Sequence, residues 1–467
     1  MQDNAQETRQ SSGWEQLGLP TLFRAFGLSK NLNALGFALA GVILIWLAGK
    51  VLDRAWPDEH KVIKVDNLDE LEVFTISGFD FAATDEFIRG QSVALRQGPG
   101  ETLTLFLRRS TNRLSDAVLS ARLFSASPEQ PGAFRAALAI PASPFWLFRF
   151  HPVYAILLTV ITAFILTFSA GAISRIAALQ ATRDERISLG EAWKFTLSKW
   201  IQFISAPAIV IGFIAVLGLC LALGGVFASI SVVNILMALL WGLALIGGFI
   251  IAALAVGGLL GWPLWFPTVA VEGSDAFDAL SRSYSYVAQR PWKALFYALA
   301  TVVYGTLCFT FIKFFARVML WSTHFWVGVG MFSDAKVTPP PPATQTVIEE
   351  PQALWQSPRA DSPFWGDFAY LDQLEGTSYI TAHIIRIWIM IVVMLVAAWG
   401  LSFFCSASTL IYLLLRRDVD GTELEEVWIE EEERDLFESP PPAPESSGST
   451  SLPVIESSSE PTPPPVS

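Results

Sequence analysis

The sequence is poor in charge, cysteine and histidine. Only 16% of its 467 residues are charged, against 52% that are hydrophobic, and this balance excludes an ordinary soluble enzyme of the same length. Its three cysteines, Cys220, Cys308 and Cys405, each lie inside a long apolar run, and none has a neighbour at the short spacing of a metal or redox pair. We therefore expect them to pack as small apolar side chains, with no metal and no disulfide.

Basic residues are too few for a nucleic-acid surface. The net charge is −12, and residues 418–467 alone carry fourteen acidic side chains against the single basic Arg434, which leaves +1 for the rest of the chain. The acidity therefore belongs to the C-terminal tail. It argues against nucleic acid as a partner and leaves contact with membrane lipids open.

Recognisable catalytic motifs are also missing. The sequence has no zinc-binding His-Glu-x-x-His, no Gly-x-Ser-x-Gly nucleophile turn, no Gly-rich phosphate loop and no pair of acids inside an apolar run. The four histidines are scattered, and all lie outside the apolar runs or at their margins. We expect neither an enzymatic activity nor a cofactor.

What the sequence does contain is long runs free of Asp, Glu, Lys and Arg. A helix needs about 20 apolar residues to cross the hydrocarbon of a membrane. Five runs approach or exceed this length: 31–49, 150–174, 200–271, 294–312 and 387–415. The third must hold at least two spans, with a break expected near Gly224, Gly225 and residues 229–234. The sequence therefore predicts about six transmembrane helices.

Basic residues near the ends of these runs predict the orientation, because cytoplasmic loops are enriched in Lys and Arg. They gather in residues 175–199, in residues 282–293 and at Arg416 with Arg417. Six spans with both termini in the cytoplasm place all three groups on one side, whereas three spans in the 200–271 run would separate them. We predict a multi-pass protein of the bacterial inner membrane, with both termini cytoplasmic.

The resulting fold class is an all-α polytopic membrane protein with interfacial amphipathic helices, a small α/β extramembrane segment and a disordered tail. In the extramembrane segment, residues 61–76 are strand-like, and residues 103–124 follow a helical pattern after Gly98-Pro99-Gly100. The predicted segments are a cytoplasmic N-terminus (1–30), a first span (31–52), an extracytoplasmic segment (53–151), a four-span core (152–320), a Pro-containing extracytoplasmic loop (321–380), a last span (381–417) and an acidic Pro/Ser/Glu tail (418–467).

Two short segments outside the spans share a pattern. Residues 188–198 and 274–286 each open with a capping-type residue, carry acids in the first turn and continue to aromatic and basic residues. The sequence predicts two amphipathic helices lying along the cytoplasmic interface.

The fourth span combines small residues with two prolines. Ala253, Gly257 and Gly261 recur every fourth position and predict a surface that another helix can approach closely. Pro263 and Pro267 then predict a kink or break. A broken helix would line a binding site, as in transporters, whereas an ordinary helix end would place tryptophans in the aromatic belt. The ordinary end is favoured, since no ionisable residue lies at the membrane midplane beside it.

An acidic cluster follows this span and forms the best candidate site. Asp275, Asp278 and Arg282 fall on one helical face, close to Glu272. Together they could contact a lipid head group or a metal. As first-turn acids with a partner one turn away, they equally fit an ordinary solvated helix start, which is the more common role for such charges.

Two stretches carry a family resemblance. Residues 265–284, with Pro267, an acidic-Gly pair at Glu272-Gly273 and alternating Ala and Ser, and residues 412–421, with Arg416-Arg417, resemble uncharacterised bacterial multi-pass membrane proteins. These are similar to the membrane region attached to some glycerophosphodiester phosphodiesterases. The resemblance implies the membrane architecture over about residues 152–421, and no catalytic domain accompanies it.

Three functions fit these features. A scaffold or accessory protein is favoured, with membrane lipids and a protein bound by the tail as partners. Its contacts there would be the apolar Trp428, Leu436 and Phe437, set among acids that a basic groove could bind; a purely solvating tail is the alternative. The other two functions are a transporter or channel for a small or lipid-like substrate, and a protein that binds lipid head groups.

Overall fold

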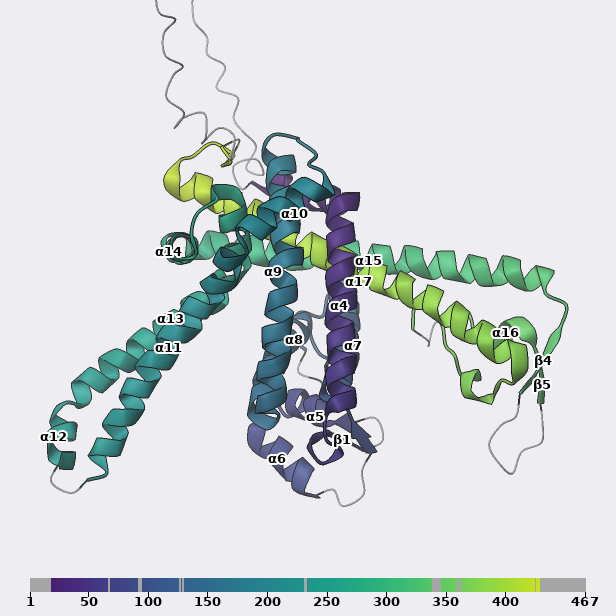
Figure 1. Ribbon diagram of the computed structural model, residues 1–467, viewed down its shortest axis with the longest axis horizontal. Helices are drawn as coiled ribbons and strands as arrows, with labels where there is room; N and C mark the ends of the chain where they lie inside the picture. Colours follow the sequence, from purple (N-terminus) through teal and green to yellow (C-terminus); the bar gives the residue numbers. More distant parts are fainter. Residues whose placement is uncertain are drawn as a thin grey trace, which may run out of the picture. The chain divides into compact units, whose positions relative to one another are not determined.

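The computed structural model describes residues 18–428, apart from 66–67, 91–94, 126, 128–129, 231–232, 338–345, 359–362 and 425. Six of its helices are long and apolar enough to cross a membrane (Figure 1). They are α4 (Leu32–Ala55), α9 (Pro152–Thr182), α11 (Trp200–Ala228), α13 (Trp241–Glu272), α15 (Pro291–Gly330) and α17 (Gly376–Asp420). The prediction of an all-α polytopic fold with about six transmembrane helices is confirmed.

The long uncharged run folds as two spans. Helices α11 and α13 pack against each other as a hairpin, and the short α12 (Val233–Leu239) lies between them in the chain (Figure 1). Helix α11 ends at Ala228, so the chain breaks within the polar 229–234 stretch as predicted. Gly224 and Gly225 remain inside α11, because glycine lowers helix stability by about 1 kcal/mol per residue without by itself ending a helix that neighbouring turns support.

Both short amphipathic segments are helices, as predicted. Helix α10 (Leu189–Ser198) opens with a capping box, in which the Ser188 hydroxyl accepts from the Glu191 N–H at 3.2 Å and the Glu191 carboxylate accepts from the Ser188 N–H at 2.7 Å. Helix α14 (Ala276–Gln289) begins after Asp275, whose carboxylate caps it. Their placement along a membrane surface stays a prediction.

Helix α14 packs against the small-residue surface of α13, where a close helix contact was predicted. A Cβ built on Gly257 would lie 2.3 Å from the ring of Tyr284 in α14, so only glycine lets the two helices approach this closely. The Tyr284 hydroxyl donates to the Leu254 carbonyl at 2.6 Å and fixes the ring there. Of the predicted kink or break, the break is wrong, because α13 continues through Pro263 and Pro267 to Glu272; the kink stays a prediction. Packing against neighbouring helices supports such a helix where proline removes a backbone donor.

The segment between α4 and α9 folds as a small α/β unit. Strand β1 pairs antiparallel with both β2 and β3, and Phe74, Phe106 and Trp146 are buried in its core. The Asp53 carboxylate of α4 accepts from the Gly100 N–H at 2.9 Å and joins this unit to the first span. Its elements are η1 (Asp58–His60), β1 (Val62–Val65), β2 (Leu68–Asp69), α5 (Glu70–Ile76), α6 (Phe81–Gly90), β3 (Leu95–Gln97), α7 (Pro99–Leu119) and α8 (Ala133–Phe150).

A second small unit lies between α15 and α17. Helix α15 continues to Gly330, so it covers the first ten residues of the predicted 321–380 loop, where residues 321–327 contain no proline or glycine. Strands β4 and β5 pair antiparallel, and the polyproline run between them lies outside the described residues. The other elements here are short: β4 (Asp334–Val337), β5 (Thr346–Glu349), α16 (Glu350–Leu354) and η2 (Leu371–Gln373).

The N-terminal residues that the structure describes pack against the last span. Helices α2 (Leu19–Phe23) and α3 (Ala25–Ser29) contact α17, and the Ser402 hydroxyl donates to the Ser29 carbonyl at 3.1 Å. Leu410 of α17 is fully buried in this contact. Of the cysteines, Cys405 is buried as expected, whereas Cys220 is exposed on α11, where the hairpin has few neighbours.

Candidate functional site

The six spans contact one another at the ends that adjoin the basic segments, which are residues 175–199, residues 282–293 and Arg416 with Arg417. The start of α4 contacts the end of α9, the start of α11 contacts the end of α13, and the start of α15 contacts the end of α17. Three side chains make these joins: Asn31 donates to Gln180 at 2.8 Å, Lys199 donates to the Gly273 carbonyl, and Lys293 pairs with Asp418 at 2.7 Å.

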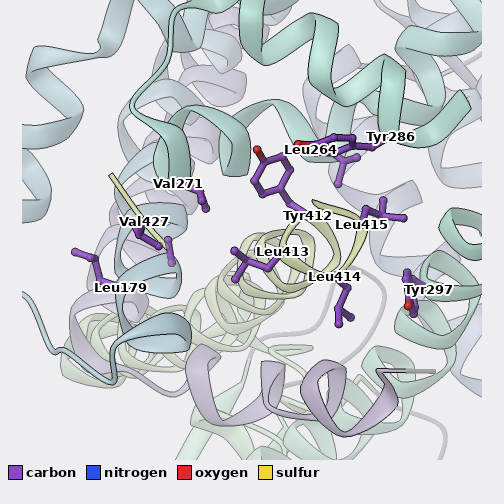
Figure 2. Packing of buried hydrophobic residues seen from close by; sticks show 11 residues of the cluster. Leu179, Leu264, Val271, Tyr286, Tyr297, Tyr412, Leu413, Leu414, Leu415 and Val427 are labelled. Atoms are coloured by element: carbon purple, nitrogen blue, oxygen red, sulfur yellow. The ribbon is translucent and has the colours of Figure 1, made fainter. Parts of the chain in front are cut away.

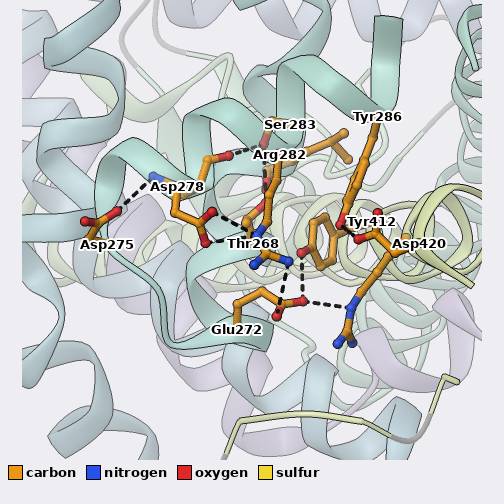
Figure 3. A network of polar contacts seen from close by, with 12 residues as sticks. Thr268, Glu272, Asp275, Asp278, Arg282, Ser283, Tyr286, Tyr412 and Asp420 are labelled. Atoms are coloured by element: carbon orange, nitrogen blue, oxygen red, sulfur yellow. Dashed lines mark hydrogen bonds and ion pairs between the residues drawn. The ribbon is translucent and has the colours of Figure 1, made fainter. Parts of the chain in front are cut away.

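Glu272 lies at the centre of this region (Figure 3). Its Oε1 accepts a hydrogen bond from the Tyr412 hydroxyl at 2.9 Å and lies 2.8 Å from Nε of Arg416. Its Oε2 lies 3.7 Å from Nη1 of Arg282. The side chains of Glu272 and Arg416 are only 14% and 9% exposed, so the pair is largely removed from water. We call Glu272, Asp278, Arg282, Tyr412 and Arg416 the Glu272 cluster.

Helix α14 supplies the rest of the predicted site. Arg282 binds Asp278 through Nε, at 2.9 and 3.0 Å from the two carboxylate oxygens, and so joins Asp278 to Glu272. Asp275 is oriented differently: its Oδ1 accepts from the Asp278 N–H at 2.8 Å and caps the helix. The structure therefore brings three of the four predicted residues together, and Asp275 positions their helix.

A tyrosine fixes the end of the last span beside this cluster. The Tyr286 hydroxyl of α14 donates to the Asp420 carboxylate at the end of α17 (Figure 3). Burial, followed by the hydrogen bond to Asp420 and the Asp420 charge, raises the pKa of Tyr286 to about 12, so the hydroxyl remains a donor at neutral pH. This hydrogen bond therefore joins α14 to the end of α17.

Local sequence patterns missed two of the five residues of this cluster, Tyr412 and Arg416. The Tyr412–Glu272 contact joins residues that are 140 positions apart. The two stretches that carry the family resemblance contain these residues, which was the one available signal. Every Glu272 oxygen already has a cationic or hydroxyl partner, and the described residues hold no group of three or more His, Cys, Asp or Glu side chains suited to a metal. The cluster joins helices rather than presenting open ligands.

The start of the tail packs back onto the spans. Helix α17 ends at Gly421, which adopts a left-handed conformation (φ 70°) that reverses the chain. Nη1 of Arg416 then donates to the Glu426 carbonyl at 2.6 Å. Val427 is 6% exposed and packs in the core beside Leu179 (Figure 2). We call residues 421–427 the tail root.

This arrangement corrects the predicted start of the tail. The helix continues through Asp420, so the tail does not begin at residue 418. Val427 is buried, because the Arg416 guanidinium holds the returning chain over an apolar surface. Trp428 is half-buried, whereas Leu436 and Phe437 lie outside the described residues.

Comparison with known proteins places the chain in a family. The family described as Domain of unknown function (DUF7847) matches residues 115–352, which is half of the chain. The chain belongs to this family. No curated protein and no solved structure matches this DUF7847 protein. The matched residues include four spans with Glu272 and Arg282, whereas Tyr412 and Arg416 lie beyond them. The similarity to membrane regions of glycerophosphodiester phosphodiesterases stays a prediction.

Proposed function

We propose that this DUF7847 protein is a non-enzymatic scaffold or accessory protein of the bacterial inner membrane, with both termini in the cytoplasm and a C-terminal tail that docks a protein partner. The observation that carries the proposal is the fixed tail root. Arg416 binds both the Glu272 carboxylate and the Glu426 carbonyl, so one guanidinium joins α13, α17 and the returning chain. The tail therefore leaves the protein from a defined position.

The paired charges of the Glu272 cluster support the same role. Its carboxylates and guanidinium groups bind one another, which is what a rigid platform at the helix ends requires. Such a platform gives a docking segment a fixed starting point, so that a partner binds the tail close to the membrane. The basic residues of the adjoining loops support the cytoplasmic placement.

The tail itself has the composition of a docking segment. Trp428, Leu436 and Phe437 flank the acidic run 430–433, and aromatic side chains among acids suit a basic groove with apolar pockets. The like charge of the run also keeps it away from anionic lipid.

The test is a gentle-detergent pull-down of the full chain. Replacing Trp428, Leu436 and Phe437 together with serine should remove specific proteins from the co-purifying set and leave membrane insertion unchanged. A matched control replaces Leu452, Val454 and Ile455 with serine, which removes three apolar side chains elsewhere in the same tail. An unchanged set in the first variant, or the same loss in both variants, would contradict docking through these residues.

A further inference from the structure

A cleft of about 720 Å³ opens beside the tail root. Four parts of the chain line it: the end of α2, the end of α9, the last turns of α17 and the tail root. Its volume falls within the range of roughly 300–1,000 Å³ that is typical of small-molecule sites. The cleft is separate from the Glu272 cluster, none of whose residues lines it.

The lining of the cleft is divided by polarity. The half-buried Leu424 supplies an apolar surface, with the buried Leu410 and Leu413 behind it, and Arg24, Arg183 and Asp184 supply charges beside it. Leu410 and Leu413 belong to a membrane span, whereas Arg183 and Asp184 follow the end of one. The cleft therefore runs from the apolar part of the helices to the level of the first charged residues, which is where lipid head groups lie.

Arg24 presents an exposed guanidinium group to the cleft, which makes it the best candidate to bind a ligand. Its side chain is exposed at the cleft, and its guanidinium has no hydrogen-bond or ion-pair partner among the residues that the structure describes. A guanidinium offers a planar fork of donors that matches a phosphate group. The neighbouring Thr21 hydroxyl can add a donor. With two arginines and one aspartate, the charged side chains of the cleft favour an anion.

We propose that this cleft binds the phosphate of an anionic phospholipid head group. Arg24 and Arg183 face the phosphate, Asp184 accepts from a head-group hydroxyl, and Leu424 contacts the glyceride and the first acyl carbons. The lipid phosphate shares its chemistry with soluble phosphate, which can reach the same cations. The proposal stands independently of the docking tail, since it uses none of Trp428, Leu436 and Phe437.

The test uses the purified full-length protein, freed of lipid in detergent and titrated with phosphatidylglycerol while bound lipid is counted by native mass spectrometry. Arg24→Gln should weaken phosphatidylglycerol binding about tenfold, the loss of one charge-assisted contact. The matched control is Arg186→Gln, which removes the same charge from an exposed position in the same loop as Arg183 but outside the cleft. It should leave the affinity within about twofold of wild type. Equal losses in both variants, or no loss in either, would overturn the site.

Two further arms distinguish the source of the phosphate. Leu424→Ser removes an apolar contact and should weaken phosphatidylglycerol binding while leaving binding of inorganic phosphate unchanged. If the cleft takes a lipid, phosphatidylglycerol binds more tightly than inorganic phosphate, and phosphatidylcholine binds weakly. Binding of inorganic phosphate that depends on Arg24, together with indifference to Leu424→Ser, would overturn the lipid assignment in favour of a soluble anion.

Discussion

Glu272 and Arg416 form an ion pair 2.8 Å long that joins the end of α13 to the last turns of α17. The pair is largely buried, and Tyr412 donates to the same carboxylate oxygen. A buried charge is stabilised only while its partners remain, so the two helix ends depend on each other. The fixed tail root depends on the same guanidinium.

Removing the Glu272 charge should therefore destabilise the protein. We expect Glu272→Gln to lower the free energy of unfolding by about 3 kcal/mol, because Arg416 is left in a buried position without its carboxylate. Thermal unfolding in detergent measures the change. Asp278→Asn is the control: Asp278 binds Arg282 at the surface with its side chain 40% exposed, so its loss should cost less than about 1 kcal/mol. Similar losses in the two variants would contradict the central role of Glu272.

The glycine contact between α13 and α14 gives a second test. Gly257→Ala should destabilise the protein by about 1–3 kcal/mol, because the new methyl group meets the Tyr284 ring, whose hydroxyl is held by Leu254. Gly212→Ala is the matched control within a span, since nothing lies within 4 Å of its Cβ position. It should leave stability unchanged or raise it by up to about 1 kcal/mol, because alanine favours a helix more than glycine does. Equal melting temperatures for both variants would show that α14 does not pack this closely.

The buried carboxyl group of Asp69 predicts a pH dependence. Burial raises the pKa of Asp69 above its usual value of 3.8, although its carboxylate accepts from the Glu72 N–H at 2.8 Å. A carboxyl group with a raised pKa in the folded state contributes stability at low pH, and the contribution is lost as the pH rises through that pKa. Asp69→Asn keeps a capping oxygen and cannot ionise. It should lose less stability than wild type between about pH 3.5 and pH 7.

Unfolding of both proteins across this pH series gives the comparison, in which the other titrating groups cancel. A larger loss in Asp69→Asn than in wild type would mean that the carboxylate charge stabilises the α/β unit, through its contact with Arg109 at 3.5 Å.

The features that the sequence predicted well are those encoded by neighbouring residues. The uncharged runs predicted the six spans, because the hydrocarbon of a membrane disfavours charged side chains whichever helices are neighbours. The capping pattern at Ser188 gave the start of α10 for the same local reason. The recurrence of Ala253, Gly257 and Gly261 predicted a helix contact, although the sequence could not say that α14 fills it.

The features that the sequence could not supply depend on distant partners. The prolines of α13 suggested a break, but packing against other helices maintains that helix through Glu272. Glu272 was a candidate from its local charge, yet Tyr412 and Arg416, which determine its environment, come from the last span. The burial of Val427 depends on the chain reversal at Gly421, which brings residues distant in the sequence together.

The docking proposal needs the ends of the spans near the Glu272 cluster, and the tail with them, to face the cytoplasm. Cysteine labelling with a membrane-impermeant reagent in intact cells tests this most directly, with the wild-type cysteines as background. Glu185→Cys lies in the exposed loop after α9, and Glu59→Cys lies in the exposed unit at the opposite ends of the spans. We predict that Glu59→Cys is labelled in intact cells and that Glu185→Cys is labelled only after the membrane is opened. Labelling of Glu185→Cys in intact cells would contradict the account.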